Sequence, residues 1–396
     1  NSDTTIGLKD TDTGNISAFS VTNNSNIVKT AIIEVVPYAY NCEGIPDIFS
    51  IAVKPTPVLD TITDQYVCNN LPTDSIVFIS SVSGSTFSTW SDRLIDIGYS
   101  GTSSVGIPSF IAHNSSDTPV IATIKVSTIA SGCIGIPDTF TMTINPTPKA
   151  DTIVSQIVCE HDSTQKISFT GTINPTDYHW INSDSTIGLS DTGVNDISKF
   201  KAHNPTDTIK TAVITVKPVA RTCIGSLRSF SITVKPEPKV DTIIDFVLCN
   251  TDTFTGIKFT SPVLNSTYQW SNSDTTIGLN LIGVDSITSF QTKNITNKPT
   301  IATITVTPSA NNCIGDSIQF NIRINPTPIL DTIPSTIHCN NDIIDTIFFI
   351  SSVDSTLFNW TNDNTSIGLA AIGSGAIHGF TIKNSDSIQS EAYITV

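Results

Sequence analysis

The chain has 396 residues, a net charge of −15 and only 14% charged residues. Its acidic balance argues against nucleic acid and against an anionic membrane surface as partners, because both carry negative charge themselves. This length allows several domains, each large enough to bury a core. With a single Met, this composition is typical of extracellular β-repeats rather than of cytosolic enzymes.

Self-similarity with a period near 90 residues runs through the whole chain. Tryptophan recurs at this interval, and a phenylalanine follows each Trp by 20 residues, at Phe110, Phe200, Phe290 and Phe380. A Pro-x-Pro motif closes each repeat, at Pro55, Pro146, Pro236 and Pro326. The repeats predict five domains, which we number units 1 to 5: 1–57 (partial), 58–148, 149–238, 239–328 and 329–396 (partial). Since the first and last units are incomplete, we expect the chain to be an excerpt of a longer protein.

The strands expected within a unit are clearest in unit 3. Apolar residues alternate with polar ones in short runs separated by Gly, Pro, Asn and Asp, which is typical of antiparallel strands. In chain order, the expected strands cover 151–158, 167–169, 178–180, 187–189, 197–200, 212–216 and 230–234. About seven short strands with a Trp on the third predict an all-β, Ig-like antiparallel β-sandwich in each unit. The expected core tryptophans are Trp90, Trp180, Trp270 and Trp360.

One spacing departs from the period. Cys42 and Cys133 are 91 residues apart, whereas the later steps in the same series are 90. Unit 2 has two residues between Phe87 and Trp90, where unit 3 has one between Tyr178 and Trp180. An extra residue before a core Trp predicts a β-bulge that keeps both aromatic side chains inward.

Several short motifs together resemble the PKD-like repeats of Bacteroidota surface proteins. They are Gln156-Ile157-Val158-Cys159, the Ile187-Gly188-Leu189 segment, Cys223-Ile224-Gly225 and the closing Asn145-Pro146-Thr147-Pro148. Giant gliding-motility adhesins and other cargo of the type IX secretion system carry such repeats. The resemblance covers the whole chain and implies export, a cell-surface or filament location, and a spacer or adhesive role. It supplies no catalytic residues.

Eight cysteines at two fixed registers indicate an oxidising compartment. They could pair within a unit, as in Cys159–Cys223. In an Ig-like sandwich, however, the turn after the first strand and the turn before the last strand lie at opposite ends of the domain, beyond the reach of a disulfide. In a head-to-tail array these turns face each other across a junction, which favours the inter-domain pairs Cys68–Cys223 and Cys159–Cys313. Under that scheme Cys42, Cys133, Cys249 and Cys339 would have partners outside the excerpt.

A second signal is aspartate followed by Ser or Thr. Of 30 Asp residues, 21 precede Ser or Thr, and in 15 of these cases the next residue is Ile or Thr. This pattern resembles the O-glycosylation signal of exported Bacteroidota proteins, although turn chemistry and duplication of the repeat also produce it. The candidate acceptors are Thr61, Thr152, Thr242, Thr332, Ser75, Thr208, Ser286, Ser317, Thr346 and Ser387.

No constellation of residues points to catalysis, a metal or a cofactor. Asp- and Asn-rich loops such as 182–184 and 362–364 lack the bidentate Glu and acidic spacing of calcium loops, so plain turns are favoured. We therefore predict a non-enzymatic stalk or filament segment of a giant secreted or cell-surface, adhesin-type protein. The expected partners are neighbouring repeats, like chains in a filament and covalent glycans, with no membrane contact in this segment. The alternative is a multivalent array that binds polysaccharide or another surface through repeated weak contacts.

Overall fold

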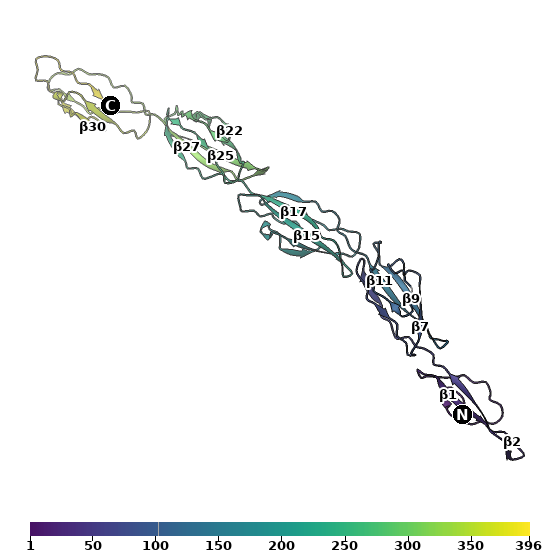
Figure 1. Cartoon of the computed structure of the whole chain (residues 1–396). Helices are drawn as coiled ribbons and strands as arrows, with labels where there is room; N and C mark the ends of the chain where they lie inside the picture. Colours follow the sequence, from purple (N-terminus) through teal and green to yellow (C-terminus); the bar gives the residue numbers. More distant parts are fainter. Residues whose placement is uncertain (102) are drawn as a thin grey trace.

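The chain forms a narrow array of five units in single file, with the two termini toward opposite ends (Figure 1). This architecture comes from a computed structural model that describes residues 1–101 and 103–396. The regular structure of those residues consists of β-strands and four single-turn 3-10 helices, η1 Thr4–Ile6, η2 Ser185–Ile187, η3 Thr275–Ile277 and η4 Thr365–Ile367. Each unit has its own hydrophobic core, so the chain is a tandem array of Ig-like β-sandwiches.

The main sheet of unit 3 carries most of its regular hydrogen bonding. Its strand order is β12-β17-β15-β13-β14, and the short β16 also pairs with β15. The strands are β12 Gln156–Cys159, β13 Asp177–Asn182, β14 Thr192–Val194, β15 Lys210–Ala220, β16 Cys223–Ile224 and β17 Arg228–Lys235. All pairs are antiparallel except β12 with β17, which run parallel.

The opposite face of unit 3 is held mainly by isolated bridges. Ala150 pairs with Gly171, Ile167 with Ile197, and Ser163 with Lys201. The expected strand 151–158 is therefore wrong in its extent. The chain first bridges this face at Ala150 and then crosses over. Only the last three residues of the expected strand, together with Cys159, form β12 in the main sheet.

The expected strand 187–189 is also wrong. Ile187 ends the 3-10 helix η2, and Gly188 caps it with φ of +95°. Asp184 begins the same turn, because its carboxylate accepts a hydrogen bond from the Thr186 N–H. The recurring Ile-Gly-Leu motif thus buries its Ile from a tight turn rather than from a strand.

Unit 4 repeats unit 3 closely, and the other units repeat parts of it. Unit 4 has the sheet order β18-β27-β25-β21-β22, with β26 pairing β25. Its strands are β18 Phe246–Cys249, β19 Thr253–Phe254, β20 Ile257–Lys258, β21 Thr267–Asn272, β22 Ile282–Val284, β23 Ser286–Ile287, β24 Phe290–Gln291, β25 Thr300–Ala310, β26 Cys313–Ile314 and β27 Ile318–Asn325. Unit 2 has β5 Gln65–Cys68, β6 Ile76–Val77, β7 Thr86–Ser91, β8 Gly106–Ile107, β9 Val120–Ala130, β10 Cys133–Ile134 and β11 Asp138–Asn145.

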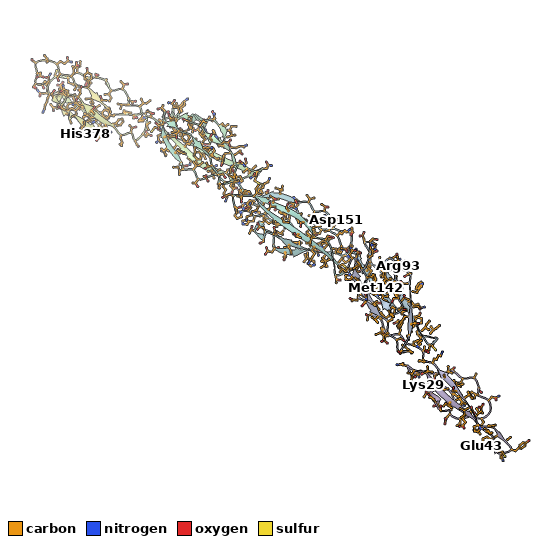
Figure 2. The ribbon with its side chains drawn as sticks, in the orientation of Figure 1. Lys29, Glu43, Arg93, Met142, Asp151 and His378 are labelled. Atoms are coloured by element: carbon orange, nitrogen blue, oxygen red, sulfur yellow. A yellow bond between two sulfur atoms is a disulfide. The ribbon has the colours of Figure 1, made fainter. Side chains whose placement is uncertain are left out.

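The two terminal units are smaller. Unit 1 contains β1 Lys29–Val35, β2 Tyr38–Ala39, β3 Cys42–Glu43 and β4 Asp47–Val53. Unit 5 contains β28 Ile343–Ile344, β29 Asn359–Asn362, β30 Ile372–Ser374, β31 Phe380–Thr381 and β32 Ile394–Thr395. Met142 lies in the core of unit 2 (Figure 2).

A buried tryptophan plugs the core of units 3, 4 and 5. Trp180, Trp270 and Trp360 are each 6% exposed. The indole N–H of Trp180 donates to the Asn195 carbonyl at 3.0 Å, and a glycine on the neighbouring strand, Gly193, leaves room for the ring. This arrangement satisfies the polar edge of the indole while burying its large apolar surface.

The tryptophan of unit 2 lies outside the core, so the prediction that Trp90 is a core residue is wrong. Trp90 is 66% exposed and pairs with Lys125 on the outer face of the sheet. The pairing of β7 with β9 is continuous, with no bulge to absorb the extra residue. Since side chains alternate strictly along a strand, Thr89 takes the inward position opposite Val126 and Trp90 turns outward.

Across the described parts of the chain, 1–101 and 103–396, no helix has the length and apolar character needed to cross a bilayer.

Candidate functional site: the stapled domain junctions

The turn before the last strand places a cysteine at the N-terminal end of each of units 1 to 4. In unit 3, β15 ends at Ala220 and a two-residue turn leads directly to Cys223. Both turn residues, Arg221 and Thr222, have positive φ, which matches the right-handed twist of the strands they connect. Unit 1 has the same turn, and Glu43 beside it lies at the N-terminal extremity of the array (Figure 2).

The first strand of the main sheet places a second cysteine at the other end of the unit. β12 runs parallel to β17, which leads out of unit 3, so Cys159 at the end of β12 lies at the C-terminal end of the unit. Cys159 and Cys223 are therefore separated by the length of the domain. This geometry explains why they are not partners.

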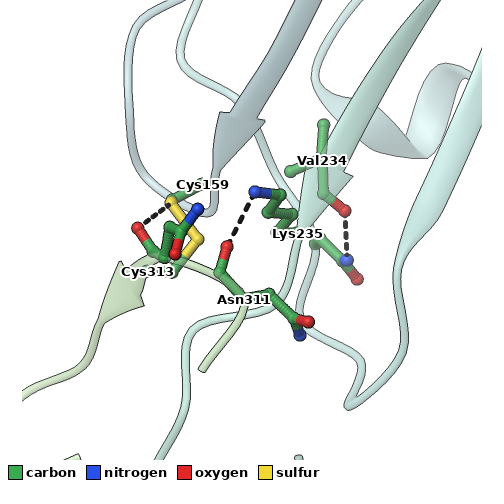
Figure 3. Close-up of a disulfide and its surroundings, with 7 residues drawn as sticks. Cys159, Val234, Lys235, Asn311 and Cys313 are labelled. Atoms are coloured by element: carbon green, nitrogen blue, oxygen red, sulfur yellow. Dashed lines mark hydrogen bonds between the residues drawn. A yellow bond between two sulfur atoms is a disulfide. The ribbon is translucent and has the colours of Figure 1, made fainter. Parts of the chain in front are cut away.

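Two disulfides cross the junctions between units. Cys68 of unit 2 is bonded to Cys223 of unit 3 with a Cα–Cα distance of 5.5 Å. Cys159 of unit 3 is bonded to Cys313 of unit 4 with a Cα–Cα distance of 5.8 Å (Figure 3). These are the two inter-domain pairs that the sequence favours, and we call them staples. The other cysteines have no disulfide partner within 1–101 and 103–396: Cys42, Cys133, Cys249 and Cys339.

The Cys-Ile-Gly and Pro-x-Pro motifs meet at the same junctions. A Cβ on Gly225 would lie 1.9 Å from the carbonyl oxygen of Pro148 in the preceding unit, so only glycine fits there. Gly315 approaches Pro238 in the same way at the next junction. Because the motifs pack against each other, each staple lies within a close backbone contact between units.

A lysine adds a polar contact at two junctions. The Lys235 ammonium donates to the Asn311 carbonyl at 2.7 Å, beside the Cys159–Cys313 staple (Figure 3). Lys54 makes the equivalent contact with the Ser131 carbonyl at 2.8 Å, between units 1 and 2. The last strand of one unit thus holds the turn of the next unit.

The junction between units 3 and 4 also carries a cluster of carboxylates and histidines. The Glu160 carboxylate is almost fully buried and accepts from the Asn204 backbone N–H. Its Oε1 atom lies 3.0 Å from Nδ1 of His203 and 3.2 Å from Nε2 of His161. His161 continues the chain of contacts to Glu237, which accepts from the Asp316 N–H of unit 4 at 3.2 Å. These contacts tie the body of unit 3 to the turn of unit 4.

At other junctions, a neutral asparagine side chain accepts the backbone hydrogen bond that Glu160 accepts here. Asn69 accepts from the Asn114 N–H, and Asn250 accepts from the Asn294 N–H, each at 2.8 Å. The charged cluster is therefore an individual feature of one junction, whereas the backbone contact it supports is common to several.

A buried asparagine holds two backbone segments together beside this contact in units 2, 3 and 4, and the sequence analysis did not predict it. Asn204 is buried, and its amide donates to the carbonyls of Thr208 and Val234, both at 2.8 Å. Asn114 and Asn294 make the same pair of bonds. The available signal was an asparagine 24 residues after each Trp, at Asn114, Asn204, Asn294 and Asn384.

All the candidate glycosylation sites are at least partly exposed. Two are half-buried, Ser286 and Thr346. The others are exposed: Thr61, Thr152, Thr242, Thr332, Ser75, Thr208, Ser317 and Ser387. Their accessibility is compatible with modification.

In the loops considered for calcium, the polar side chains form hydrogen bonds with nearby backbone groups. Asn182 is buried and donates to the Leu189 carbonyl at 2.9 Å, while Asp184 caps η2. Among the residues that the structure describes, no group of three or more His, Cys, Asp or Glu side chains is placed to hold a metal ion.

Comparisons with known proteins give structural neighbours only. A scan of protein-family models finds no match, and neither does a search of curated proteins. The I-band fragment I67–I69 of titin shares 10% identity, with 69% of this chain and 100% of that chain covered and a TM-score of 0.42. Mouse cadherin-23 EC22–24 shares 13%, with 69% and 99% covered and a TM-score of 0.32. The human desmocollin-1 ectodomain shares 11%, with 88% and 78% covered and a TM-score of 0.29. At these scores the likenesses carry no argument about function, and the architecture stands on the sheet topology given above.

Proposed function

We propose that this chain is a non-enzymatic structural segment of an extracellular repeat protein, a stalk or filament of adhesin type. The observation that carries the proposal is the pair of staples across consecutive junctions. Disulfides persist in oxidising compartments, so the staples support an extracellular location. Staples between domains, rather than within them, fix how the domains are arranged, which is what a stalk requires.

The resemblance to PKD-like repeats refines the proposal. It supports a giant surface protein of a Bacteroidota bacterium, exported by the type IX system, in which like chains associate in a filament. Continuation of the staple pattern would give Cys42, Cys133, Cys249 and Cys339 partners in further repeats. Antibodies against units 2 to 4 should then label the outside of intact, unpermeabilised cells. Labelling that requires permeabilisation would overturn the extracellular proposal.

The staple pairing has a direct chemical test. Proteolysis under non-reducing conditions should release a peptide pair joined through Cys159 and Cys313, and another joined through Cys68 and Cys223. Reduction should separate both pairs. Recovery of a Cys159–Cys223 pair instead would contradict the inter-domain arrangement.

We also propose that the array carries O-linked glycans at several Asp-Ser/Thr sites. The accessibility of the candidate residues supports the proposal, and glycans would shield exposed strand edges along the array. The intact mass of protein from its native source should exceed the polypeptide mass by several sugar increments. A mass equal to that of the bare polypeptide would rule glycosylation out.

A binding array is the second candidate, and Trp90 is the observation that favours it. Its exposed indole on the outer face of the sheet, beside Ser88 and Ser127, offers an apolar ring and hydroxyl groups to a sugar. Polysaccharide binding on a glycan array should be lost in Trp90→Ala. It should survive in Tyr66→Ala, which removes another exposed aromatic from the same unit. Absence of binding by the wild-type chain would leave only the structural role.

A further inference from the structure

The staples join four equal segments of the chain end to end in two pairs. Each segment begins at a cysteine of the turn before the last strand and ends at the cysteine after the next Pro-x-Pro. The four are 42–68, 133–159, 223–249 and 313–339, and each contains 27 residues, or 26 steps from Cα to Cα. We call them bearing segments.

A bearing segment is almost straight in the folded protein. Segment 223–249 contains β17, the Pro236-Glu237-Pro238 linker and β18, so it runs through unit 3 and then through unit 4. The 11-residue strand β15 runs most of the length of unit 3 and rises about 36 Å, which gives about 40 Å per unit. Fully extended, 26 residues reach about 90 Å, close to the length of two units. A bearing segment therefore has little slack.

The staples connect these segments into two continuous tracks. Track 1 runs through segment 42–68, the Cys68–Cys223 staple and segment 223–249. Track 2 runs through segment 133–159, the Cys159–Cys313 staple and segment 313–339. The staples bypass 155 and 154 residues respectively. Each track thus crosses four units by a covalent route of 52 Cα-to-Cα steps and one disulfide.

The two tracks lie side by side in every complete unit. In unit 3, β12 belongs to track 2 and β17 to track 1, and the two strands pair in parallel. The same holds for β5 with β11 in unit 2 and for β18 with β27 in unit 4. Tension along the array loads these ladders in shear, so several hydrogen bonds must break together before one track slides past the other.

We propose that the array is a tension-bearing cable that does not lengthen when its domains unfold. This inference rests on the proposed structural function and adds a mechanical property to it. Between Cys133 and Cys339 the folded distance is about 160 Å, at four units of about 40 Å. With the staple intact, the covalent route allows at most about 190 Å, whereas the unstapled chain would reach about 740 Å. Unfolding the residues that the staple bypasses does not increase the limit of about 190 Å.

Single-molecule pulling on the full chain tests the proposal. DNA handles are attached at Cys133 and Cys339, in a background of Cys42→Ser and Cys249→Ser, and the oxidised protein is stretched. We expect a lengthening of no more than about 30 Å beyond the folded state. In the variant that also carries Cys159→Ser and Cys313→Ser, unfolding steps should bring the total gain to about 580 Å.

A second pulling geometry provides a matched control. Handles at Cys133 and Cys249, in a background of Cys42→Ser and Cys339→Ser, lie on different tracks. Their shortest covalent route is 90 Cα-to-Cα steps and one disulfide, so the same oxidised protein should lengthen by about 200 Å as domains unfold. This control shows that domains do unfold at the applied force.

Stepwise lengthening by hundreds of ångströms between Cys133 and Cys339 in the oxidised protein would overturn the proposal. A domain-sized step with intact staples, verified by mass spectrometry of the same sample, would do so most directly. That outcome would leave the extracellular structural role untouched, because cell-surface labelling tests it independently. Conversely, failed surface labelling would leave the measured mechanics in place.

Discussion

Units 2 and 3 are built from the same repeat, yet they use their tryptophans in opposite ways. Trp180 is 6% exposed in the core of unit 3, whereas Trp90 is 66% exposed on the outer face of unit 2. Phe87 in unit 2 and Tyr178 in unit 3 occupy the same place, since they pair with Thr128 and Pro218 at matching positions of the partner strand. The strands agree in register, and only the position of the Trp along the strand differs.

The difference shows that strand register, rather than residue type, decides which side chain is buried. From Phe87 to Ile97 there are ten steps, and from Tyr178 to Ile187 there are nine. The extra residue of unit 2 therefore lies after the inward Phe87, where the strand leads into the following turn. A bulge would have been needed to turn Trp90 inward, and unit 2 instead fills its core with other side chains, including Tyr99.

Replacing the two tryptophans by alanine should give the largest contrast. Trp180→Ala removes a buried indole and should destabilise unit 3 by about 3–5 kcal/mol. Trp90→Ala should change the stability of unit 2 by no more than about 0.5 kcal/mol, because its side chain is mostly in water. Hydrogen exchange measured by mass spectrometry on peptides from each unit separates the two effects.

Each variant has its own internal control, since the other units report on the rest of the array. Peptides from unit 4 should exchange as in the wild type in both variants. Equal losses of protection in unit 2 and unit 3 would contradict the assignment of Trp90 to the surface.

The next comparison concerns Gly193, which packs against the indole ring of Trp180. A Cβ on Gly193 would lie 2.1 Å from Cζ2 of Trp180, so Gly193→Ala must displace the ring or the strand. We expect a cost of about 1–3 kcal/mol to unit 3. Ser103 lies 90 residues earlier in unit 2, where no inward tryptophan needs the space. Ser103→Ala removes only the hydrogen bond that its Oγ accepts from the Val105 N–H at 3.3 Å, so it should cost no more than about 1 kcal/mol. The same peptide-resolved exchange measures both, and a neutral Gly193→Ala would argue against the tight contact.

Quenching of fluorescence tests the contrast without disturbing the fold. Iodide should quench the emission of Trp90 selectively, because the other three indoles are buried. Trp90→Phe should therefore remove most of the quenchable emission, while Trp270→Phe should leave it unchanged. Quenching that persists in Trp90→Phe would mean that a second indole is open to solvent.

The array and its staples were largely predictable from the sequence. Period-two alternation gave the strands of the main sheet, and the opposite ends occupied by Cys159 and Cys223 favoured pairing across junctions. The sequence did not show on which face of the sheet Trp90 lies, because either a bulge or a neighbouring turn can accommodate one added residue. The break in the first strand depends on where the chain crosses between sheets, and local pattern does not encode that crossing.

The smallest contrast concerns the turn that follows the tryptophan strand. Asp184 caps η2 in unit 3, and Leu94 stands at the equivalent place in unit 2, packed against the core. Asp184→Ala should destabilise unit 3 by about 0.5–1 kcal/mol.

The cap should also respond to pH. The hydrogen bond from the Thr186 hydroxyl, aided by its backbone N–H, lowers the pKa of Asp184 below the ordinary value, against a smaller opposing effect of burial. A group whose pKa is lowered on folding stabilises the fold above its unfolded pKa and loses that contribution as the pH falls through its folded pKa. The difference in unfolding free energy between wild type and Asp184→Ala should therefore be largest at neutral pH and should shrink below about pH 4. A penalty that stays constant down to pH 2 would show that the carboxylate charge is not what caps the turn.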